Sequence, residues 1–167
     1  QTGNGRTGTL YAYMQFDISP DVVTTAKGLC AGLPLGATML SEKVQNVLGF
    51  GDHGSTFGGN PICCAGALNT LSRLDDALLQ EVKEKSAYIK KELEGAPGVL
   101  SVDGMGLMLG IKTKAPAAKV LAACREKGVL CLTAKDKVRL LPPLNIPFDV
   151  LKKAIAVLKE ACMEEES

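Results

Sequence analysis

The part of the chain after residue 74 alternates helix-like and strand-like hydrophobic patterns, and this order limits the fold to a mixed α/β arrangement. Apolar side chains recur at helical spacing over residues 75–94, and Gly95 follows as a residue suited to the position after a helix. Downstream we predict a hairpin of strands 99–102 and 107–111 with its turn at Asp103-Gly104, a helix over 116–127, strands at 129–132 and 138–141, and a last helix with Leu151, Ala154, Ile155, Leu158 and Cys162 on one face. Each helix has one apolar face to bury, so residues 78–167 are expected to form a small α/β domain.

Residues 1–77 are expected to belong to a second, incomplete domain. β-Branched residues predict a short strand over 21–25, and a further strand is predicted over 35–40, with glycines at the turns between them. Asn60-Pro61 has the order of a helix N-cap followed by a first-turn proline, so a helix is predicted to begin there. The chain begins inside a glycine-rich loop, which indicates a piece of a longer protein.

Composition argues against several classes of function. The 167 residues are 46% hydrophobic and 22% charged, as in ordinary folded proteins, and the formal net charge is +1. The sequence has no basic stripe interleaved with aromatic residues, so nucleic acid and anionic membranes are not expected as partners. The longest apolar stretch, residues 29–40, is interrupted by glycine and proline and is shorter than the roughly 20 residues that span a bilayer.

The six cysteines predict neither a disulfide framework nor a metal site. They are scattered through apolar segments of a chain too large to need disulfides, the sequence has no CxxC motif, and it has a single histidine, His53. The amino terminus does not resemble a secretory signal. We therefore expect reduced thiols, no bound metal and a cytoplasmic location.

Lys27 is the first candidate for chemistry. Its neighbours in Thr24-Thr25-Ala26-Lys27-Gly28-Leu29 are small or apolar, and no carboxylate lies within five residues on either side. Desolvation would lower the pKa of the amine and favour the neutral form that a Schiff-base nucleophile needs. A surface lysine beside a flexible glycine explains the same composition, and the local sequence leaves both interpretations open.

Three other features also have a functional and a structural interpretation. Gly3–Gly8 matches the GxGxxG dinucleotide pattern, but without a preceding strand it favours a plain glycine-rich loop. Ser55 and Thr56 lie ahead of the helix at Pro61, where hydroxyls and backbone amides suit a phosphate dianion, but Ser55, Thr56 and Asn60 equally suit capping and turn roles. Arg139 lies in an otherwise apolar strand and is expected to pair with a carboxylate, either of a ligand or of the protein.

Five segments stand out together: 1–8 (QTGNGRTG), 20–29 (PDVVTTAKGL), 53–61 (HGSTFGGNP), 104–110 (GMGLMLG) and 138–144 (VRLLPPL). In this order and spacing they resemble the carboxyl-terminal part of the class III, fold type I, pyridoxal-phosphate aminotransferases, most closely the acetylornithine and ornithine aminotransferase group. The resemblance covers essentially the whole chain. It implies the carboxyl-terminal portion of a large cofactor-binding domain over 1–77, then the small α/β domain over 78–167, and it identifies the GxGxxG match as the family's glycine loop.

The resemblance also implies roles for particular residues. Lys27 would bind pyridoxal 5′-phosphate covalently and later move a proton between substrate and cofactor, and Gln1 would hydrogen-bond the ring hydroxyl. Ser55 and Thr56 would reach the cofactor phosphate of a neighbouring subunit, which implies a homodimer, and Arg139 would hold the substrate's α-carboxylate. The implied reaction passes an amino group from acetylornithine, or a similar ω-amino donor, to the cofactor and then to 2-oxoglutarate, in arginine metabolism.

Two departures from the family pattern limit these implications. Asp103 stands where many family members carry a basic residue, and we expect little catalytic effect because Asp-Gly suits a turn. Family members also carry upstream an acid for the pyridinium nitrogen, an aromatic for the ring and a helix terminus for the phosphate, so we expect the isolated chain to be inactive or weak. Two alternatives remain: a non-catalytic folded fragment that self-associates, and another class III activity such as that of an aminobutyrate aminotransferase.

Overall fold

The computed structural model describes residues 1–164 and divides the chain into two compact units. The first unit is Gln1–Leu79 and the second begins at Gln80. The division falls near the start of helix α2 (Asp76–Leu93), which Asp75 caps by accepting a hydrogen bond of 2.8 Å from the Leu78 N–H. The assignment of the two units to a large and a small domain stays a prediction.

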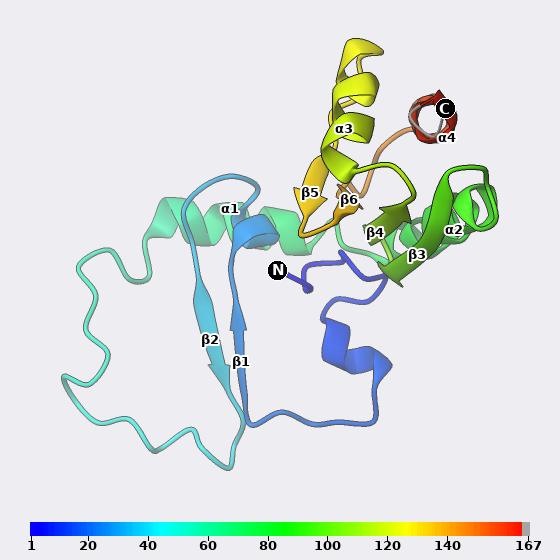
Figure 1. The fold of residues 1–167 in the computed structure, drawn as a ribbon. Coiled ribbons are helices and arrows are strands. Elements are labelled where there is room, and N and C mark those ends of the chain that lie inside the picture. Colours follow the sequence, from blue (N-terminus) through cyan, green and yellow to red (C-terminus); the bar gives the residue numbers. More distant parts are fainter. Residues whose placement is uncertain (165–167) are drawn as a thin grey trace. The chain divides into compact units, whose positions relative to one another are not determined.

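The first unit contains a two-stranded antiparallel ribbon and one α-helix. Its elements are η1 (Ala12–Gln15), β1 (Val22–Thr25), η2 (Lys27–Cys30), β2 (Ala37–Leu40) and α1 (Pro61–Leu71). Strands β1 and β2 run side by side, with Val22 opposite Leu40 (Figure 1). Helix α1 begins where the sequence predicts, because the Asn60 carboxamide oxygen accepts hydrogen bonds from the N–H groups of Ile62 (3.0 Å) and Cys63 (3.3 Å).

The second unit is a four-stranded antiparallel sheet combined with three helices, as the alternating hydrophobic pattern predicts. Its elements are α2, β3 (Val99–Met105), β4 (Met108–Thr113), α3 (Ala117–Glu126), β5 (Leu132–Ala134), β6 (Lys137–Leu140) and α4 (Phe148–Glu164). The strand order is β3-β4-β6-β5, so β6 crosses back to pair with β4 (Figure 1).

One face of this sheet forms the core. In β4, Leu109 and Ile111 are buried and alternate with partly exposed residues, and Val138 of β6 faces the same way. Helices α2, α3 and α4 contribute most of the other buried side chains, which include Val82, Ile89, Leu93, Val120, Cys124, Leu151, Ile155 and Leu158. Burying each large aliphatic side chain contributes about 1.5–3 kcal/mol, so this cluster accounts for the folding of the second unit.

The hairpin turn lies three residues later than the sequence indicates. Strand β3 continues to Met105, and Met105 pairs directly with Met108, so the turn is Gly106-Leu107. Gly106 supplies the positive φ of 53° that a tight hairpin needs, and Leu107 is fully buried in the core. The prediction of a turn at Asp103-Gly104 is therefore wrong, because burial of Leu107 fixes the register.

Strand β5 also begins later than expected. After α3, the Val129 N–H donates to the Cys124 carbonyl (2.9 Å) and the Gly128 N–H to the Arg125 carbonyl (3.0 Å). These two bonds form a Schellman motif around Gly128, whose φ is 81°. Residues 129–131 complete the helix end and do not join the sheet.

The state of the cysteines and the length of the helices are relevant to two sequence predictions, reduced thiols and no membrane-spanning segment. All six cysteines are free thiols; Cys30, Cys124 and Cys162 are buried and the others are half-buried. No helix within residues 1–164 is both long enough and apolar enough to cross a membrane.

Candidate active site

Lys27 lies at the end of strand β1, where the chain turns sharply. It is the first residue of η2 and has a left-handed φ of 54°, which is uncommon for a residue with a Cβ. Its Nζ donates a hydrogen bond of 2.6 Å to Oε1 of Gln1. The fold therefore brings together the amine and the amide that the resemblance assigns to one cofactor, although 26 residues separate them in the sequence.

The side chain of Lys27 is exposed in this chain. The apolar residues that follow it, Leu29 and Cys30, are 4% and 1% exposed, so they turn inward while the lysine points outward. Of the two interpretations that the local sequence leaves open, the surface lysine is the one that this chain shows. Apolar neighbours in the sequence do not bury Lys27, because the turn points their side chains into the protein interior and the lysine side chain towards solvent.

Asn4 is a residue of this site that the sequence indicated only as part of a glycine loop. It is 8% exposed, and its Nδ2 donates to Oγ1 of Thr25 (3.2 Å) and to the carbonyl oxygen of Ala26 (3.0 Å). The Ala26 carbonyl precedes Lys27, so Asn4 holds the peptide that sets the direction of the lysine. What identifies Asn4 as important is that its polar side chain is buried and hydrogen-bonded, a property that only the folded structure reveals.

The turn that carries Lys27 packs against helix α1. At Gly66, an added Cβ would lie 2.9 Å from Sγ of Cys30, so a residue without a side chain is needed there. Sγ of Cys30 also lies 2.9 Å from the carbonyl oxygen of Cys63, to which it donates. Helix α1 thus supports the backbone on the inner side of Lys27.

Ser55 and Thr56 are exposed and lie in the loop before α1. The Gly58 N–H donates to the Ser55 carbonyl (3.2 Å), which closes a turn. Capping of α1 comes from Asn60, so the interpretation of Ser55, Thr56 and Asn60 as capping and turn residues is confirmed for Asn60 as the cap and for Ser55 as a turn residue. Their hydroxyl groups remain suited to an anion, and their assignment to a cofactor phosphate stays a prediction.

Arg139 belongs to the second unit, in strand β6 between Val138 and Leu140. It is half-buried, and its strand borders a pocket of about 250 Å³ on the core side of the sheet, whose other lining residues are apolar or cysteine. Among the residues that the structure describes, no carboxylate forms an ion pair with Arg139. The interpretation in which Arg139 pairs with a carboxylate of this chain is therefore not supported.

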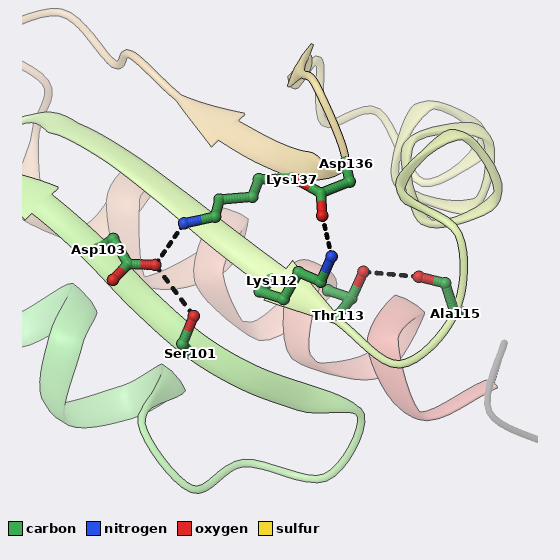
Figure 2. A network of polar contacts seen from close by, with 7 residues as sticks. All are labelled: Ser101, Asp103, Lys112, Thr113, Ala115, Asp136 and Lys137. Atoms are coloured by element: carbon green, nitrogen blue, oxygen red, sulfur yellow. Dashed lines mark hydrogen bonds and ion pairs between the residues drawn. The ribbon is translucent and has the colours of Figure 1, made fainter.

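Asp103, the departure from the family pattern, lies within β3 and takes part in a polar network on the sheet (Figure 2). Its Oδ2 accepts hydrogen bonds from Nζ of Lys137 (2.6 Å) and from Oγ of Ser101 (2.9 Å). The bond from Lys137, followed by that from Ser101, lowers the pKa of the Asp103 carboxyl below its ordinary value. Lys112 makes a separate ion pair with Asp136.

The dinucleotide interpretation of the glycine loop finds no support in the fold. The element that follows the loop is η1, a 3₁₀ turn of four residues, and a pyrophosphate site would need an α-helix there. A dinucleotide site also needs an acid about 20 residues after the loop, for the ribose. The nearest candidate, Asp21, instead pairs with Lys43 (2.9 Å) and accepts a hydrogen bond from Ser41 Oγ (3.1 Å). Within residues 1–164, no group of three His, Cys, Asp or Glu side chains is arranged to hold a metal ion.

Comparison with known sequences identifies one family. The sequence model of the family described as aminotransferase class-III matches residues 1–162. The acetylornithine aminotransferase of Haemophilus ducreyi is 48% identical over 166 residues, which are 98% of this chain and 42% of that protein. The acetylornithine aminotransferase of Bacillus subtilis is 42% identical over 96% of this chain and 43% of its own length. The chain thus spans less than half the length of the curated relatives it matches.

Solved structures show the same similarity. The acetylornithine aminotransferase from Elizabethkingia anophelis superimposes with a TM-score of 0.89 at 30% identity, over 98% of this chain and 44% of that one. A structure of the ornithine aminotransferase from Toxoplasma gondii, reported with partial occupancy of PLP at its active site, gives a TM-score of 0.90 at 32% identity, over 99% of this chain and 42% of that one.

Proposed function

Because the chain belongs to the class III aminotransferase family, we propose that it carries the lysine and the substrate arginine of a pyridoxal-phosphate-dependent aminotransferase. The observation that carries the proposal is the pair of Lys27 Nζ and Gln1 Oε1 at 2.6 Å. A primary amine and a carboxamide side by side at the end of a strand suit an aldehyde cofactor with a neighbouring ring hydroxyl. The fold matches that of the acetylornithine aminotransferase from Elizabethkingia anophelis.

The residues present fit pyridoxal 5′-phosphate. Lys27 offers an exposed amine for the aldehyde, and Gln1 keeps its Nε2 group as a donor for the ring oxygen, since only Oε1 binds the lysine. Ser55 and Thr56 offer hydroxyls for the phosphate of a second subunit's cofactor, so the proposal includes a homodimer. When bound, the cofactor ring withdraws electrons from the substrate carbon that carries the amino group.

Lys27 has two tasks in this proposal. Its amine would hold the cofactor, and once released Nζ would accept a proton from the substrate carbon that carries the amino group. The left-handed φ of 54° and the Asn4 bond to the Ala26 carbonyl fix the root of the side chain. A fixed root limits the positions that Nζ samples and favours the one needed for proton transfer.

Arg139 binds the substrate in this proposal. Its guanidinium has no carboxylate partner among the described residues of the chain, and a planar guanidinium binds a carboxylate through two parallel hydrogen bonds. We assign it the α-carboxylate of the substrate, in a reaction that takes the amino group from acetylornithine and gives it to 2-oxoglutarate. The reaction belongs to arginine metabolism, and we place it in the cytoplasm.

A second candidate is a folded fragment without activity that associates with itself. Large apolar side chains are exposed in the first unit, with Phe50 at 112%, Phe57 at 81% and Val47 at 67% of their reference areas. Such a surface favours association. Size-exclusion chromatography separates the two candidates: assembly that requires pyridoxal phosphate supports the enzyme, and assembly without it supports the fragment.

A transamination assay tests the proposed function. The chain, its Lys27→Ala variant and the Haemophilus ducreyi relative are each supplied with pyridoxal phosphate, 2-oxoglutarate and either acetylornithine or 4-aminobutyrate. We expect trace glutamate formation from acetylornithine that Lys27→Ala abolishes and the surface control Lys43→Ala keeps, at a turnover far below the usual range of about 1–10³ s⁻¹. Preference for 4-aminobutyrate would favour another class III activity, and equal rates for Lys27→Ala and the unchanged chain would refute the proposal.

A further inference from the structure

The outer face of the four-stranded sheet places Asp103 and Arg139 in one row. Asp103 of β3 is opposite Gly110 of β4, and Gly110 is opposite Arg139 of β6. Residues directly opposite in a sheet point to the same face, and the adjacent residues Ile111 and Val138 point into the core. Asp103 and Arg139 therefore point to the same outer face, across Gly110.

This row brings an aspartate within reach of the arginine. The two backbones are two strand spacings apart, about 10 Å, a span that an extended arginine and an aspartate side chain cover together. Gly110, between them, has no side chain to separate the charges. An Asp103–Arg139 ion pair is thus compatible with the backbone, and it would use the guanidinium that the proposed function assigns to substrate.

In the structure, Lys137 rather than Arg139 forms the ion pair with Asp103. It projects from β6 on the same face as Arg139, two residues away, and crosses β4 to reach Asp103 (Figure 2). The crossing runs over Gly110, where an added Cβ would lie 3.2 Å from Cδ of Lys137. Ser101 gives the same carboxylate oxygen a second donor, at 2.9 Å.

The network therefore satisfies one oxygen of Asp103 twice. Lys137 and Ser101 also lower the pKa of this carboxyl, so it is ionised at neutral pH and would compete for any cation left beside it. With Lys137 in place, its ammonium group neutralises the Asp103 carboxylate, so Asp103 does not pair with Arg139.

We propose that Lys137 is a positioning residue that keeps Asp103 away from Arg139 and so leaves the guanidinium open to a substrate carboxylate. The functional part of this inference rests on the proposed role of Arg139 in binding substrate. The competition between Lys137 and Arg139 for Asp103 is inferred from the geometry alone. In the proposed reaction, loss of Lys137 weakens binding of the carboxylate substrate, and loss of Asp103 as well restores it.

The test measures the rate at which phenylglyoxal modifies Arg139 in the 167-residue chain, followed by peptide mass mapping. The variants are Lys137→Met, Lys137→Met with Asp103→Asn, Lys137→Arg, and the matched control Lys112→Met, which removes a lysine of the same face that pairs with Asp136. We expect Lys137→Met to slow modification about twofold to fivefold, the size of a surface ion pair's effect, and the double variant to return it to the native rate. Lys137→Arg and Lys112→Met are expected to react as the native chain does.

Rescue by Asp103→Asn separates positioning from a structural role, because a damaged sheet would not recover when a second residue is changed. An unchanged rate in Lys137→Met, or a slow rate that persists in the double variant, would overturn the proposal. Circular dichroism of each variant checks the fold.

A second readout separates this inference from the proposed function. Protection of Arg139 by added 2-oxoglutarate in the native chain, weaker in Lys137→Met and regained in the double variant, supports both. If 2-oxoglutarate gives no protection but the modification rates still follow the pattern above, the assignment of Arg139 to substrate fails and the competition for Asp103 is upheld.

Discussion

Replacing Asn4 tests how the glycine loop holds the turn of Lys27. Asn4→Ala removes two hydrogen bonds, to Thr25 Oγ1 and to the Ala26 carbonyl, and each contributes about 0.5–1.5 kcal/mol net. It also places alanine at a φ of 54°, a left-handed conformation that asparagine adopts several-fold more readily than alanine, and this difference adds about 1 kcal/mol. The local free energy of opening should therefore fall by about 3 kcal/mol.

Asn4→Gly removes the same bonds without the strain, since glycine adopts positive φ freely, and should cost about 2 kcal/mol. The assay is hydrogen exchange of the Leu29 amide, which donates to the Ala26 carbonyl at 3.1 Å. At tenfold per 1.4 kcal/mol, we expect exchange to rise roughly 100-fold in Asn4→Ala and roughly 30-fold in Asn4→Gly.

The control is Asn69→Ala, which removes an exposed carboxamide of α1 that binds Arg73 and should leave the Leu29 amide unchanged. Unaltered exchange in both Asn4 variants would refute the reasoning that Asn4 holds this turn. Equal exchange in the two variants would refute the strain contribution.

Three other predictions concern the second unit. Gly98→Ala should lower the free energy of unfolding in urea by about 2–5 kcal/mol, because the added Cβ would lie 2.1 Å from the Cys162 carbonyl oxygen at a φ of 76°. Gly95→Ala, with a φ of 78° and open space around it, should lower it by only about 1–2 kcal/mol, and equal losses would contradict the clash. Asp103 has a lowered pKa when folded, so it stabilises above its ordinary pKa of 3.8 and loses this contribution as the pH falls through the lowered value; Asp103→Asn should flatten the fall in Tm between pH 7 and pH 3, and an unchanged slope would contradict this. Burial raises the pKa of Cys162 to about 11, so iodoacetamide at pH 8 should alkylate it more slowly than half-buried Cys64, as mapped by mass spectrometry, and equal rates would contradict this.

Local signals in the sequence predicted the helix ends well. Asn60-Pro61, Gly95 and Gly128 mark helix boundaries in the structure because capping depends on residues adjacent in the chain. The resemblance to class III aminotransferases is confirmed, because several motifs along the chain matched one family and the family model covers residues 1–162.

Properties that depend on distant residues were not predictable in the same way. The turn of the hairpin shifted to Gly106 because Leu107 is buried by the helices, and Asp103 is held by Lys137, 34 residues away. The exposure of Lys27 and its support from Asn4 likewise depend on contacts across 22 or more residues. The individual roles of the site residues stay predictions.

The central claim is that Lys27 is the amine that binds the cofactor. The direct measurement is to incubate the chain with pyridoxal phosphate, reduce it with borohydride and locate the pyridoxyl group by peptide mass mapping, with the exposed Lys43 as internal reference. The account predicts a single stoichiometric adduct on Lys27, which Gln1→Ala reduces. Scattered, substoichiometric labelling in which Lys43 reacts as much as Lys27 would contradict it.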